Sequence, residues 1–170
     1  MSPPRARAAR IRLLVLDVDG VLTDGRLHFG PAGEETKVFH VRDGLAIVAA
    51  RTAGLGIAVI SGRASAAVSR RMAELGVGDV YQGVGDKAGV LAGIRSRLSL
   101  EMAEIAVMGD DLTDLALMRG AGLALAPSDA APEVRRSAHW ISRRPGGAGA
   151  VRDAIEMLLR ARKAWPPREK

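Results

Sequence analysis

Four short apolar runs, each followed by a turn rich in Gly, Asp or Ser, constrain the fold of this chain more than any other feature. They are residues 13–18, 57–60, 105–108 and 123–125. Helical spacing of apolar residues predicts helices between and after these runs. The expected helices span 43–53, 64–75, 87–98, 111–119 and 149–162. Strands that alternate with helices indicate an α/β fold, in which a mostly parallel sheet carries helices on both faces. Wholly apolar strands are typical of a sheet that is covered on both sides.

The length of the chain fits a single domain, and we expect residues 1–170 to form one. Its ends are rich in proline and basic residues, so we expect 1–10 and 164–170 to be flexible tails. The formal net charge is +6, of which residues 1–12 carry +4 and 160–170 another +4, leaving −2 for the rest. Solvated termini explain this distribution better than a surface that binds nucleic acid. We therefore expect no nucleic-acid partner.

The composition argues against several classes of function. No segment approaches the roughly 20 apolar residues of a membrane-spanning helix, and the apolar run near the N-terminus is too short for a signal-peptide core. We expect a cytoplasmic protein with no membrane partner. The chain has no cysteine, which excludes disulfides, thiolate nucleophiles and cysteine-bound zinc.

Two carboxylates leave the first apolar run together. Asp17 and Asp19 are two residues apart at the end of a predicted strand, so their side chains point to the same side. Burying two like charges is costly unless a cation compensates for them. A magnesium ion with oxygen ligands suits a site that also holds phosphate. Gly20, which follows, permits a tight turn and the close approach of a ligand.

Polar residues that suit phosphoryl chemistry follow the other runs. Asp110 and Asp111 end the third run, and neighbouring strands would bring them near the first pair. Asp111 or Thr113 could instead only cap the helix that follows, and so could Asp114. Ser61 ends the second run next to a helix N-terminus, which makes a site for phosphate oxygens. Lys87 could neutralise a transferring phosphoryl group or be a solvated helix residue.

Together these residues supply what phosphoryl transfer needs, which is a carboxylate nucleophile, a carboxyl group as proton donor, a metal and neutralising donors. The four motifs, in this order, resemble those of the haloacid dehalogenase superfamily. They are Asp17-Val-Asp-Gly20, Ser61-Gly-Arg63, the lone Lys87 and Gly109-Asp-Asp-Leu-Thr-Asp114. The resemblance implies a three-layer, Rossmann-like fold.

The resemblance also implies a role for each motif residue. Asp17 attacks phosphorus and forms an aspartyl-phosphate, while Asp19 protonates the leaving oxygen and later deprotonates the attacking water. Ser61 and Lys87 hold the phosphoryl group. The implied ligands of Mg²⁺ are Asp17, Asp19 through its backbone carbonyl, Asp110 and Asp111, where Asp111 either binds the ion or orients its waters. An acidic residue at position 19 fits a phosphatase, whereas a dehalogenase or a P-type pump is not expected to have one.

Longer stretches narrow the resemblance to the 3-deoxy-D-manno-octulosonate 8-phosphate (KDO 8-phosphate) phosphatases. These stretches are residues 17–25, 39–44, 60–63 and 146–152, within a similarity that covers about 11–160. The resemblance implies hydrolysis of a small sugar-acid phosphate in lipopolysaccharide precursor synthesis. The implied substrate-binding residues are Thr23, Asp24, Arg42, Asp43, Gly44, Gly62 and Arg63.

Several positions bear on the sugar pocket. His40 stands where this family often has Asn, and Leu45 where it often has an aromatic residue, so the pocket departs from the family in detail. Arg63 stands where the related 2-keto-3-deoxynonulosonate 9-phosphate (KDN 9-phosphate) phosphatases tend to have Glu. Its guanidinium could pair with the carboxylate of the sugar acid, which favours KDO 8-phosphate. Asp43 is equally well placed as the N-cap of the helix predicted to follow it.

Spacing predicts an uncovered active site. Residues 26–41 are typical of a β-hairpin that projects from the loop after the first strand. Many superfamily members insert a cap domain, but only 44 residues separate Asp17 from Ser61 and only 26 separate Ser61 from Lys87. The hairpin and the predicted helices use up these residues, so we expect no cap domain. An open pocket would expose the phosphoenzyme to solvent, and the resemblance implies a homotetramer with the hairpin at its subunit contacts.

Other functions stay open at this level. One is a phosphatase for KDN 9-phosphate or another sugar phosphate. Another is a nucleic-acid end phosphatase whose basic tails hold the polymer. A third is a non-catalytic scaffold, against which the intact carboxylates, Ser61 and Lys87 count. His139, beside Trp140, is expected to be a buried structural residue and not a metal ligand.

Overall fold

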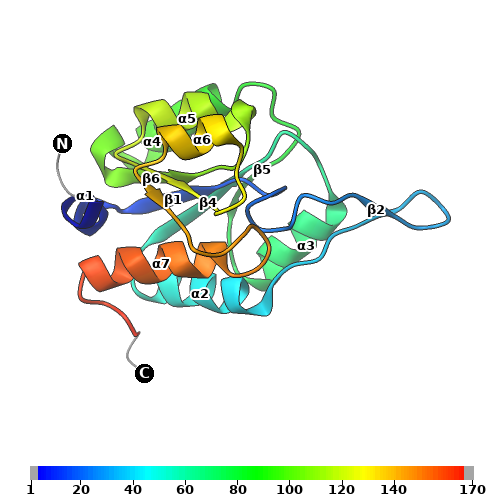
Figure 1. Cartoon of the computed structure of the whole chain (residues 1–170), viewed down its shortest axis with the longest axis horizontal. Helices are drawn as coiled ribbons and strands as arrows, with labels where there is room; N and C mark the ends of the chain where they lie inside the picture. The colour runs from blue at the N-terminus through cyan, green and yellow to red at the C-terminus, as the bar shows by residue number, and fades with distance from the viewer. Residues whose placement is uncertain (1–3, 167–170) are drawn as a thin grey trace.

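The computed structural model describes residues 4–166, in which six strands form one parallel sheet (Figure 1). Their order across the sheet is β5-β4-β1-β6-β7-β8. The strands are β1 (Leu13–Leu16), β4 (Gly56–Ile60), β5 (Asp79–Tyr81), β6 (Ile105–Met108), β7 (Leu123–Ala126) and β8 (Trp140–Ile141). The four predicted apolar runs are the four central strands, which confirms the α/β fold. The edge strands β5 and β8 are short and less buried, so they carry no comparable apolar signal.

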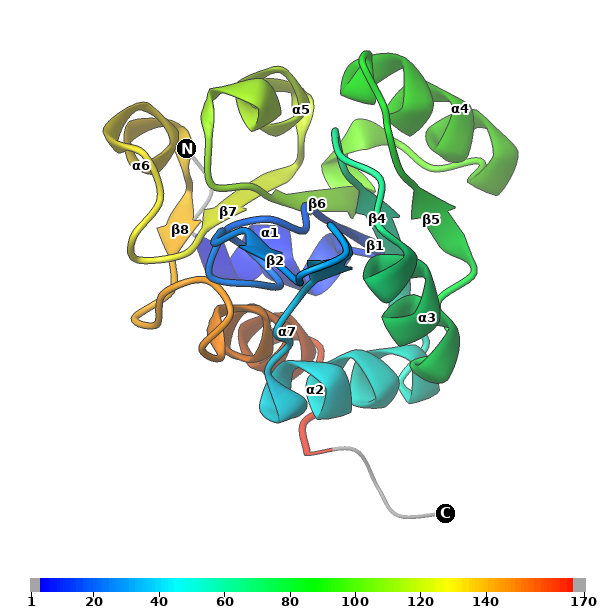
Figure 2. The same cartoon turned by 90° about the vertical axis from the view of Figure 1, so that its right-hand side faces the viewer.

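Helices cover both faces of the sheet (Figure 2). One face carries α2 (Val41–Thr52), α3 (Ala66–Glu74) and α7 (Ala150–Ala161), and the other carries α4 (Lys87–Leu98), α5 (Leu115–Gly120) and α6 (Pro132–Ser137). Two short 3₁₀ helices are η1 (Met102–Glu104) and η2 (Leu112–Asp114). Leu14 and Leu16 of β1 point into the core on the α2 and α7 side, and Leu13 and Val15 into the opposite core. Among the described residues, no helix has the length and apolar character that crossing a bilayer requires.

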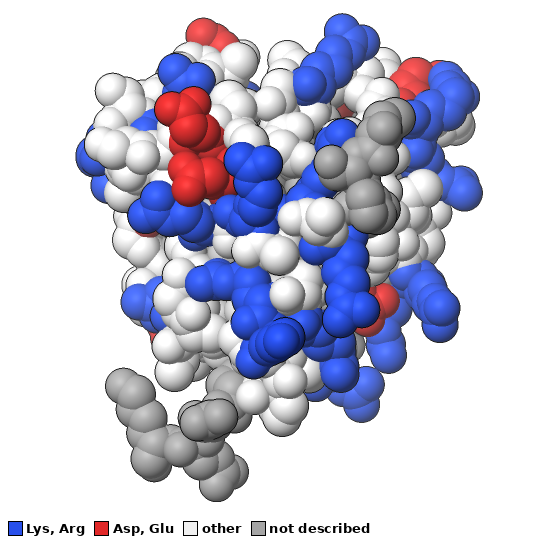
Figure 3. All heavy atoms as spheres, turned by 90° about the vertical axis from the view of Figure 1, so that its left-hand side faces the viewer, with Lys and Arg blue, Asp and Glu red and all other residues white. Residues whose placement is uncertain are grey.

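The expectation of a flexible N-terminal tail is wrong for residues 4–10. They form helix α1 (Pro4–Arg10), which packs against α7 and buries Ala8 completely. Ala8 and the neighbouring Ile11 are both fully buried, and this apolar contact holds the helix while its arginines reach into solvent. Figure 3 shows the face of the molecule on this side, over which Lys and Arg side chains are spread.

Ala164 and Trp165, near the C-terminus, also contact the body of the protein. The Ala164 N–H donates a hydrogen bond to the Leu159 carbonyl at 2.8 Å. The guanidinium of Arg152 lies over the Trp165 ring, 5.3 Å from its centre. The expected tail at 164–170 is therefore wrong for these two residues, and residues 1–3 and 167–170 lie outside the described residues.

His139 is a structural residue, as its sequence context predicts, but it is partly and not fully buried. Its Nδ1 accepts a hydrogen bond from the Ala124 N–H at 2.9 Å, and its Nε2 lies 2.8 Å from the guanidinium of Arg7. Burial lowers the pKa of the ring, with a contribution from Arg7. The imidazole therefore links α1 to β7.

The predicted hairpin forms and projects from the body (Figure 1). Its strands, β2 (His28–Phe29) and β3 (Glu35–Thr36), pair antiparallel. The chain then leaves the strand, Lys37 turns toward the body, and α2 begins at Val41 with His40 as its N-cap. Between β1 and β4 the described chain holds only this hairpin and α2, and between β4 and α4 only α3 and β5. No cap domain lies in either stretch of the described chain.

Candidate active site

The loops after β1, β4 and β6 meet at one edge of the sheet, because the carboxyl ends of neighbouring parallel strands lie together. Leu16 of β1 pairs with Val59 of β4 and with Met108 of β6. The residues that follow these partners line an open pocket of about 450 Å³. Its lining includes Asp17, Asp19, Ser61, Gly62, Arg63, Lys87, Asp110 and Asp111. The structure thus brings together the residues predicted for catalysis and metal binding, with two of those predicted for substrate binding.

Three carboxylates converge in this pocket. Asp17, Asp110 and Asp114 each place one oxygen within 4.8 Å of the others. Oδ1 of Asp17 and Oδ1 of Asp110 are buried and accept no hydrogen bond. Burial raises the pKa of Asp110 to about 8, and the neighbouring carboxylates add to the effect. Burial likewise raises the pKa of Asp17 to about 6, with Asp114 adding to the shift and Lys87 opposing it.

These two buried oxygens accept no hydrogen bond, although Lys87 lies 3.1 Å from that of Asp17, and they fit a magnesium ion. Carboxylate oxygens are the donors that Mg²⁺ prefers, and a divalent charge would relieve the repulsion between the three acidic groups. The donor set contains no sulfur and no imidazole, which matches a hard cation.

A buried lysine stands beside the carboxylates. Nζ of Lys87 lies 2.7 Å from Oδ1 of Asp114 and 3.1 Å from Oδ1 of Asp17. Burial alone would lower the pKa of this ammonium, but the two carboxylates more than compensate, so its pKa is raised. Lys87 is therefore a fixed positive charge in the pocket and not a solvated helix residue.

Asp114 belongs to the cluster, although its sequence position indicates only a helix cap. Its Oδ2 does accept hydrogen bonds from the N–H groups of Asp110 (3.0 Å) and Asp111 (3.4 Å), so it caps η2 as well. Its Oδ1 holds Lys87. Asp110 lies in the loop before η2, so helical spacing does not relate the two residues, and the sequence carries no signal that would have brought Asp114 into the cluster.

Asp111 lines the pocket beside the cluster of three carboxylates. Its Oδ1 accepts a hydrogen bond from the Leu112 N–H at 2.7 Å, which caps η2. The side chain is exposed at the pocket and lies outside the cluster of three carboxylates. The structure therefore brings Asp114, and not Asp111, next to Asp17 and Asp110.

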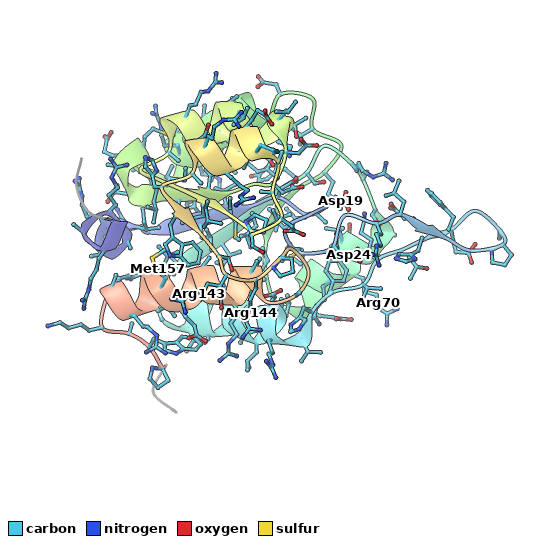
Figure 4. The ribbon with its side chains drawn as sticks, in the orientation of Figure 1. Asp19, Asp24, Arg70, Arg143, Arg144 and Met157 are labelled. Atoms are coloured by element: carbon cyan, nitrogen blue, oxygen red, sulfur yellow. The ribbon has the colours of Figure 1, made fainter. Side chains whose placement is uncertain are left out.

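Asp19 faces the hairpin, and Figure 4 shows it where the hairpin joins the body. Its Oδ1 lies 2.5 Å from Nζ of Lys37, and its Oδ2 lies 3.6 Å from Nε of Arg63. Glu35 contacts both of these cations. Sequence patterns did not single out Lys37 or Glu35, because their role depends on how the hairpin packs.

Ser61 and two glycines shape the pocket wall. The Ser61 side chain is buried, and its Oγ accepts a hydrogen bond from the Arg63 N–H at 3.2 Å. Gly20 has φ +85°, and a Cβ there would meet the carboxylate of Asp110. A Cβ on Gly146 would meet the carbonyl of Gly20. The glycine run before α7 therefore does more than start that helix, because it lets the chain pack against the loop that carries Asp19.

Three of the predicted substrate-binding residues lie outside the pocket lining. Thr23 is buried, and its hydroxyl donates to the Val18 carbonyl at 3.4 Å, which stabilises the loop after β1. Asp24 is exposed and accepts a hydrogen bond from the Arg26 N–H at 3.0 Å (Figure 4). Arg42 is exposed in the first turn of α2.

Asp43 and Gly44 also lie away from the pocket. Asp43 is not the N-cap of its own helix. Its two carboxylate oxygens accept hydrogen bonds from the N–H groups of Arg152 (2.7 Å) and Gly149 (3.2 Å), so it caps α7 across the interface. Burial raises the pKa of Asp43, and these hydrogen bonds oppose the shift. A Cβ on Gly44 would meet the guanidinium of Arg71, so this glycine allows α2 and α3 to approach closely.

Phosphoryl transfer requires an oxygen nucleophile and fixed positive charge around the phosphate oxygens. Asp17 offers a carboxylate oxygen that accepts no hydrogen bond, and Lys87, 3.1 Å from it, would supply the charge together with a cation on the carboxylates. On a Rossmann-like sheet with no cap domain among the described residues, this arrangement is typical of a hydrolase that acts on phosphate esters.

Comparison with known proteins shows to which family of hydrolases this chain belongs. A family described as haloacid dehalogenase-like hydrolases matches residues 73–155. The KDO 8-phosphate phosphatase KdsC of Escherichia coli K12 is 42% identical over 156 residues, which cover 92% of this chain and 83% of that protein. The KdsC protein of Yersinia pestis is 41% identical over 155 residues, 91% of this chain and 83% of that one.

Solved structures give the same result. The KDO 8-phosphate phosphatase of Moraxella catarrhalis, in complex with magnesium, phosphate and KDO, superposes with a TM-score of 0.93 at 38% identity and covers 95% of this chain and 93% of its own. The Yersinia pestis enzyme gives 0.92 at 40% identity, with coverage of 94% and 86%. The chain belongs to the KDO 8-phosphate phosphatases of the haloacid dehalogenase superfamily, and it is a Mg²⁺-dependent phosphatase.

Proposed function

We propose that this enzyme hydrolyses KDO 8-phosphate to KDO and inorganic phosphate, a step of lipopolysaccharide precursor synthesis. The observation that carries the proposal is the cluster of Asp17, Asp110 and Asp114 beside Lys87, in a chain similar to KDO 8-phosphate phosphatases over nearly its whole length. The Moraxella catarrhalis relative was solved with magnesium, phosphate and KDO, which are the metal and the two products of this reaction.

Asp17 is the proposed nucleophile, and Asp19 the proposed acid and base. One oxygen of Asp17 attacks phosphorus while the bond from phosphorus to the sugar oxygen breaks, which leaves an aspartyl-phosphate. Asp19 gives its proton to the departing sugar oxygen. It then takes a proton from the water that attacks the aspartyl-phosphate, so that inorganic phosphate leaves and Asp17 is restored.

The remaining residues of the site place positive charge and a hydrogen-bond donor around the phosphoryl group. Asp17, Asp110 and the backbone carbonyl of Asp19 would hold Mg²⁺, which supplies positive charge to the phosphate oxygens when it is bound. Lys87 adds a second positive charge, and the Ser61 hydroxyl offers a hydrogen bond to the phosphoryl group. Because Lys87 is buried and paired, its charge needs little rearrangement when the substrate arrives.

Arg63 is the proposed contact for the carboxylate of the sugar acid. It lies in the pocket lining, and its side chain is about half exposed. A guanidinium can bind a carboxylate through two parallel hydrogen bonds. The positive side chains of α1 lie beyond the amino-terminal end of β1, away from this pocket, which supports a small-molecule substrate and not a nucleic acid.

A panel of phosphate esters tests the proposed function. It comprises KDO 8-phosphate, KDN 9-phosphate, common hexose phosphates and a 5′-phosphorylated oligonucleotide, each with Mg²⁺ and with chelator. We expect the highest kcat/KM for KDO 8-phosphate and loss of activity with chelator. A higher kcat/KM for KDN 9-phosphate would reassign the substrate. Activity on the oligonucleotide that falls steeply with salt would point to a polymer substrate.

We propose a homotetramer in which neighbouring subunits cover the open pocket. Six large apolar side chains on the hairpin and on α2 are exposed, and we call them the apolar strip. They are Leu27, Phe29, Val38, Val41, Leu45 and Val48. Exposed apolar groups gathered on one part of a surface are typical of protein contacts. If sedimentation finds a monomer under conditions in which the enzyme is fully active, this assembly is refuted. We also propose a cytoplasmic location, which fractionation of cells tests.

A further inference from the structure

Four charged side chains form a closed ring at the base of the hairpin. Nζ of Lys37 lies 2.5 Å from Asp19 and 3.3 Å from Glu35, and the Arg63 guanidinium lies 2.8 Å from Glu35 and 3.6 Å from Asp19. Positive and negative groups alternate around the ring. Two of its members come from the hairpin, one from the loop after β1 and one from the loop after β4.

Lys37 is buried to an unusual degree for a hairpin residue. Its side chain is 2% exposed, whereas Val38, the next residue, is 64% exposed. An ammonium is placed in such surroundings at a high desolvation cost, which only well-placed negative partners offset. The described chain has two buried lysines, and each contacts one carboxylate of the loop after β1. Lys87 contacts Asp17, and Lys37 contacts Asp19.

The ring fixes which oxygen of Asp19 is available. Oδ1 is held by Lys37 at hydrogen-bond distance, while Oδ2 is 3.6 Å from the nearest nitrogen of Arg63, beyond a good hydrogen bond. Oδ2 is therefore the oxygen that remains for a proton on its way to the substrate. Glu35 holds Lys37 from the other side and keeps Arg63 at the pocket.

We propose that Lys37 is a positioning residue for the proton transfer by Asp19, with Glu35 as its support. This inference rests on the proposed function of Asp19. As the bond between phosphorus and the ester oxygen breaks, the proton on Oδ2 moves to that oxygen, and Asp19 is left as a carboxylate. Lys37 holds this carboxylate in the orientation from which it next accepts a proton from water.

Two substrates with different leaving groups distinguish a role of Lys37 in proton transfer from a purely structural role. An alkyl phosphate needs a proton on its leaving oxygen, whereas p-nitrophenyl phosphate releases a stable phenolate without one. The variant Lys37→Met keeps the length of the side chain and removes its charge. Stopped-flow or rapid-quench measurement of the first release of alcohol or nitrophenol isolates the step in which Asp19 acts as an acid.

We expect Lys37→Met to slow release from the sugar phosphate by about tenfold to a hundredfold, part of the effect that general acid catalysis provides. Nitrophenol release should slow by less than about threefold, because it does not use that proton. Lys37→Arg, which keeps the charge, should restore part of the difference. The exposed hairpin residue Arg26 gives a matched control, and Arg26→Met should leave both rates unchanged.

An equal loss with both substrates would overturn the proposal, because it would mean that Lys37 only holds the hairpin or the pocket together. No loss with either substrate would also overturn it. If circular dichroism shows that Lys37→Met does not fold, Glu35→Gln decides the question, since it loosens Lys37 and should change the same ratio of rates. The alkyl phosphate is whichever one the wild type hydrolyses fastest, so a wrong sugar assignment changes the substrate and leaves this ratio measurable.

Discussion

The ammonium of Lys87 and the carboxylate of Asp114 form a buried ion pair, 2.7 Å long, beside the proposed nucleophile. Asp114 holds this lysine with one oxygen while its other oxygen accepts backbone N–H groups at the start of η2. The pair therefore joins the phosphate-facing charge to the loop that carries Asp110. Neither residue can change without affecting the other.

Asp114→Asn should weaken catalysis without abolishing it. The amide keeps the shape but loses the negative charge that fixes Lys87, and a hydrogen bond to a charged group is worth about 1.5–3 kcal/mol. We expect kcat/KM to fall by about tenfold to a hundredfold. Steady-state kinetics check this, with Asp79→Asn as a control because Asp79 pairs with Arg97 away from the pocket. Unchanged kinetics for Asp114→Asn would show that catalysis does not depend on the ion pair between Asp114 and Lys87.

Magnesium binding should release protons. Without metal, the pKa of Asp110 is about 8, so at pH 7 this carboxyl group is mostly protonated, and its proton must leave when a cation binds. We expect about one proton released per Mg²⁺ at pH 7 and fewer at pH 9. Titration calorimetry in buffers of different ionisation enthalpy measures this number. Binding without proton release at pH 7 would contradict the raised pKa.

The same shifts set the pH dependence of stability. The ordinary pKa of an aspartate is 3.8, whereas Asp17 and Asp110 titrate near 6 and 8 in the metal-free fold. Between these limits the folded protein binds more protons than the unfolded chain, so its free energy of unfolding falls as the pH rises. The stabilisation is full below about pH 4 and lost as the pH passes 8. In thermal melts, the metal-free protein should be more stable at pH 5 than at pH 8, and Mg²⁺ should reduce this difference.

Asp43→Ala should destabilise the fold and spare catalysis. It removes the acceptor for two N–H groups at the start of α7, and each orphaned buried donor costs about 1–3 kcal/mol. Urea denaturation should show a loss of about 2–3 kcal/mol, and Asp43→Asn should lose less because one acceptor remains. Activity per folded molecule should be close to wild type. A large fall in kcat/KM at unchanged stability would instead make Asp43 a substrate contact.

Charges in the apolar strip should dissociate the proposed assembly. Val41 is 77% exposed and Phe29 63% exposed, and a glutamate at each would place a charge in a subunit contact. We expect the double variant to sediment as a smaller species with a raised KM for the sugar phosphate. Leu98→Glu, on α4 away from the hairpin, is the matched control and should keep the wild-type mass. An unchanged mass for the double variant would remove the strip from the interface.

The convergence of Asp17, Ser61 and Asp110 could be predicted because it follows from topology. Apolar runs give the strands, parallel order puts their carboxyl ends together, and the residues after them must then meet. This part of the site needs no knowledge of how any loop packs.

Asp43 and Lys37 could not be placed in this way. Each acts on an element far from it in the chain, Asp43 on the start of α7 and Lys37 on Asp19. Local patterns carry no information about such contacts, and so Asp43 looked like the cap of its own helix. Helix α1 was missed for a related reason, because the burial of Ala8 depends on α7 lying beside it.

The covalent intermediate on Asp17 is the most direct test of the mechanism. The enzyme is mixed with Mg²⁺ and KDO 8-phosphate, quenched during turnover, treated with borohydride and mapped by mass spectrometry, with Asp17→Asn as the control. An aspartyl-phosphate is reduced to homoserine, so we predict homoserine at position 17 in the wild type and no turnover by the variant, which should remain folded. Homoserine at a different aspartate, or an Asp17→Asn variant that still hydrolyses the substrate, would contradict the account.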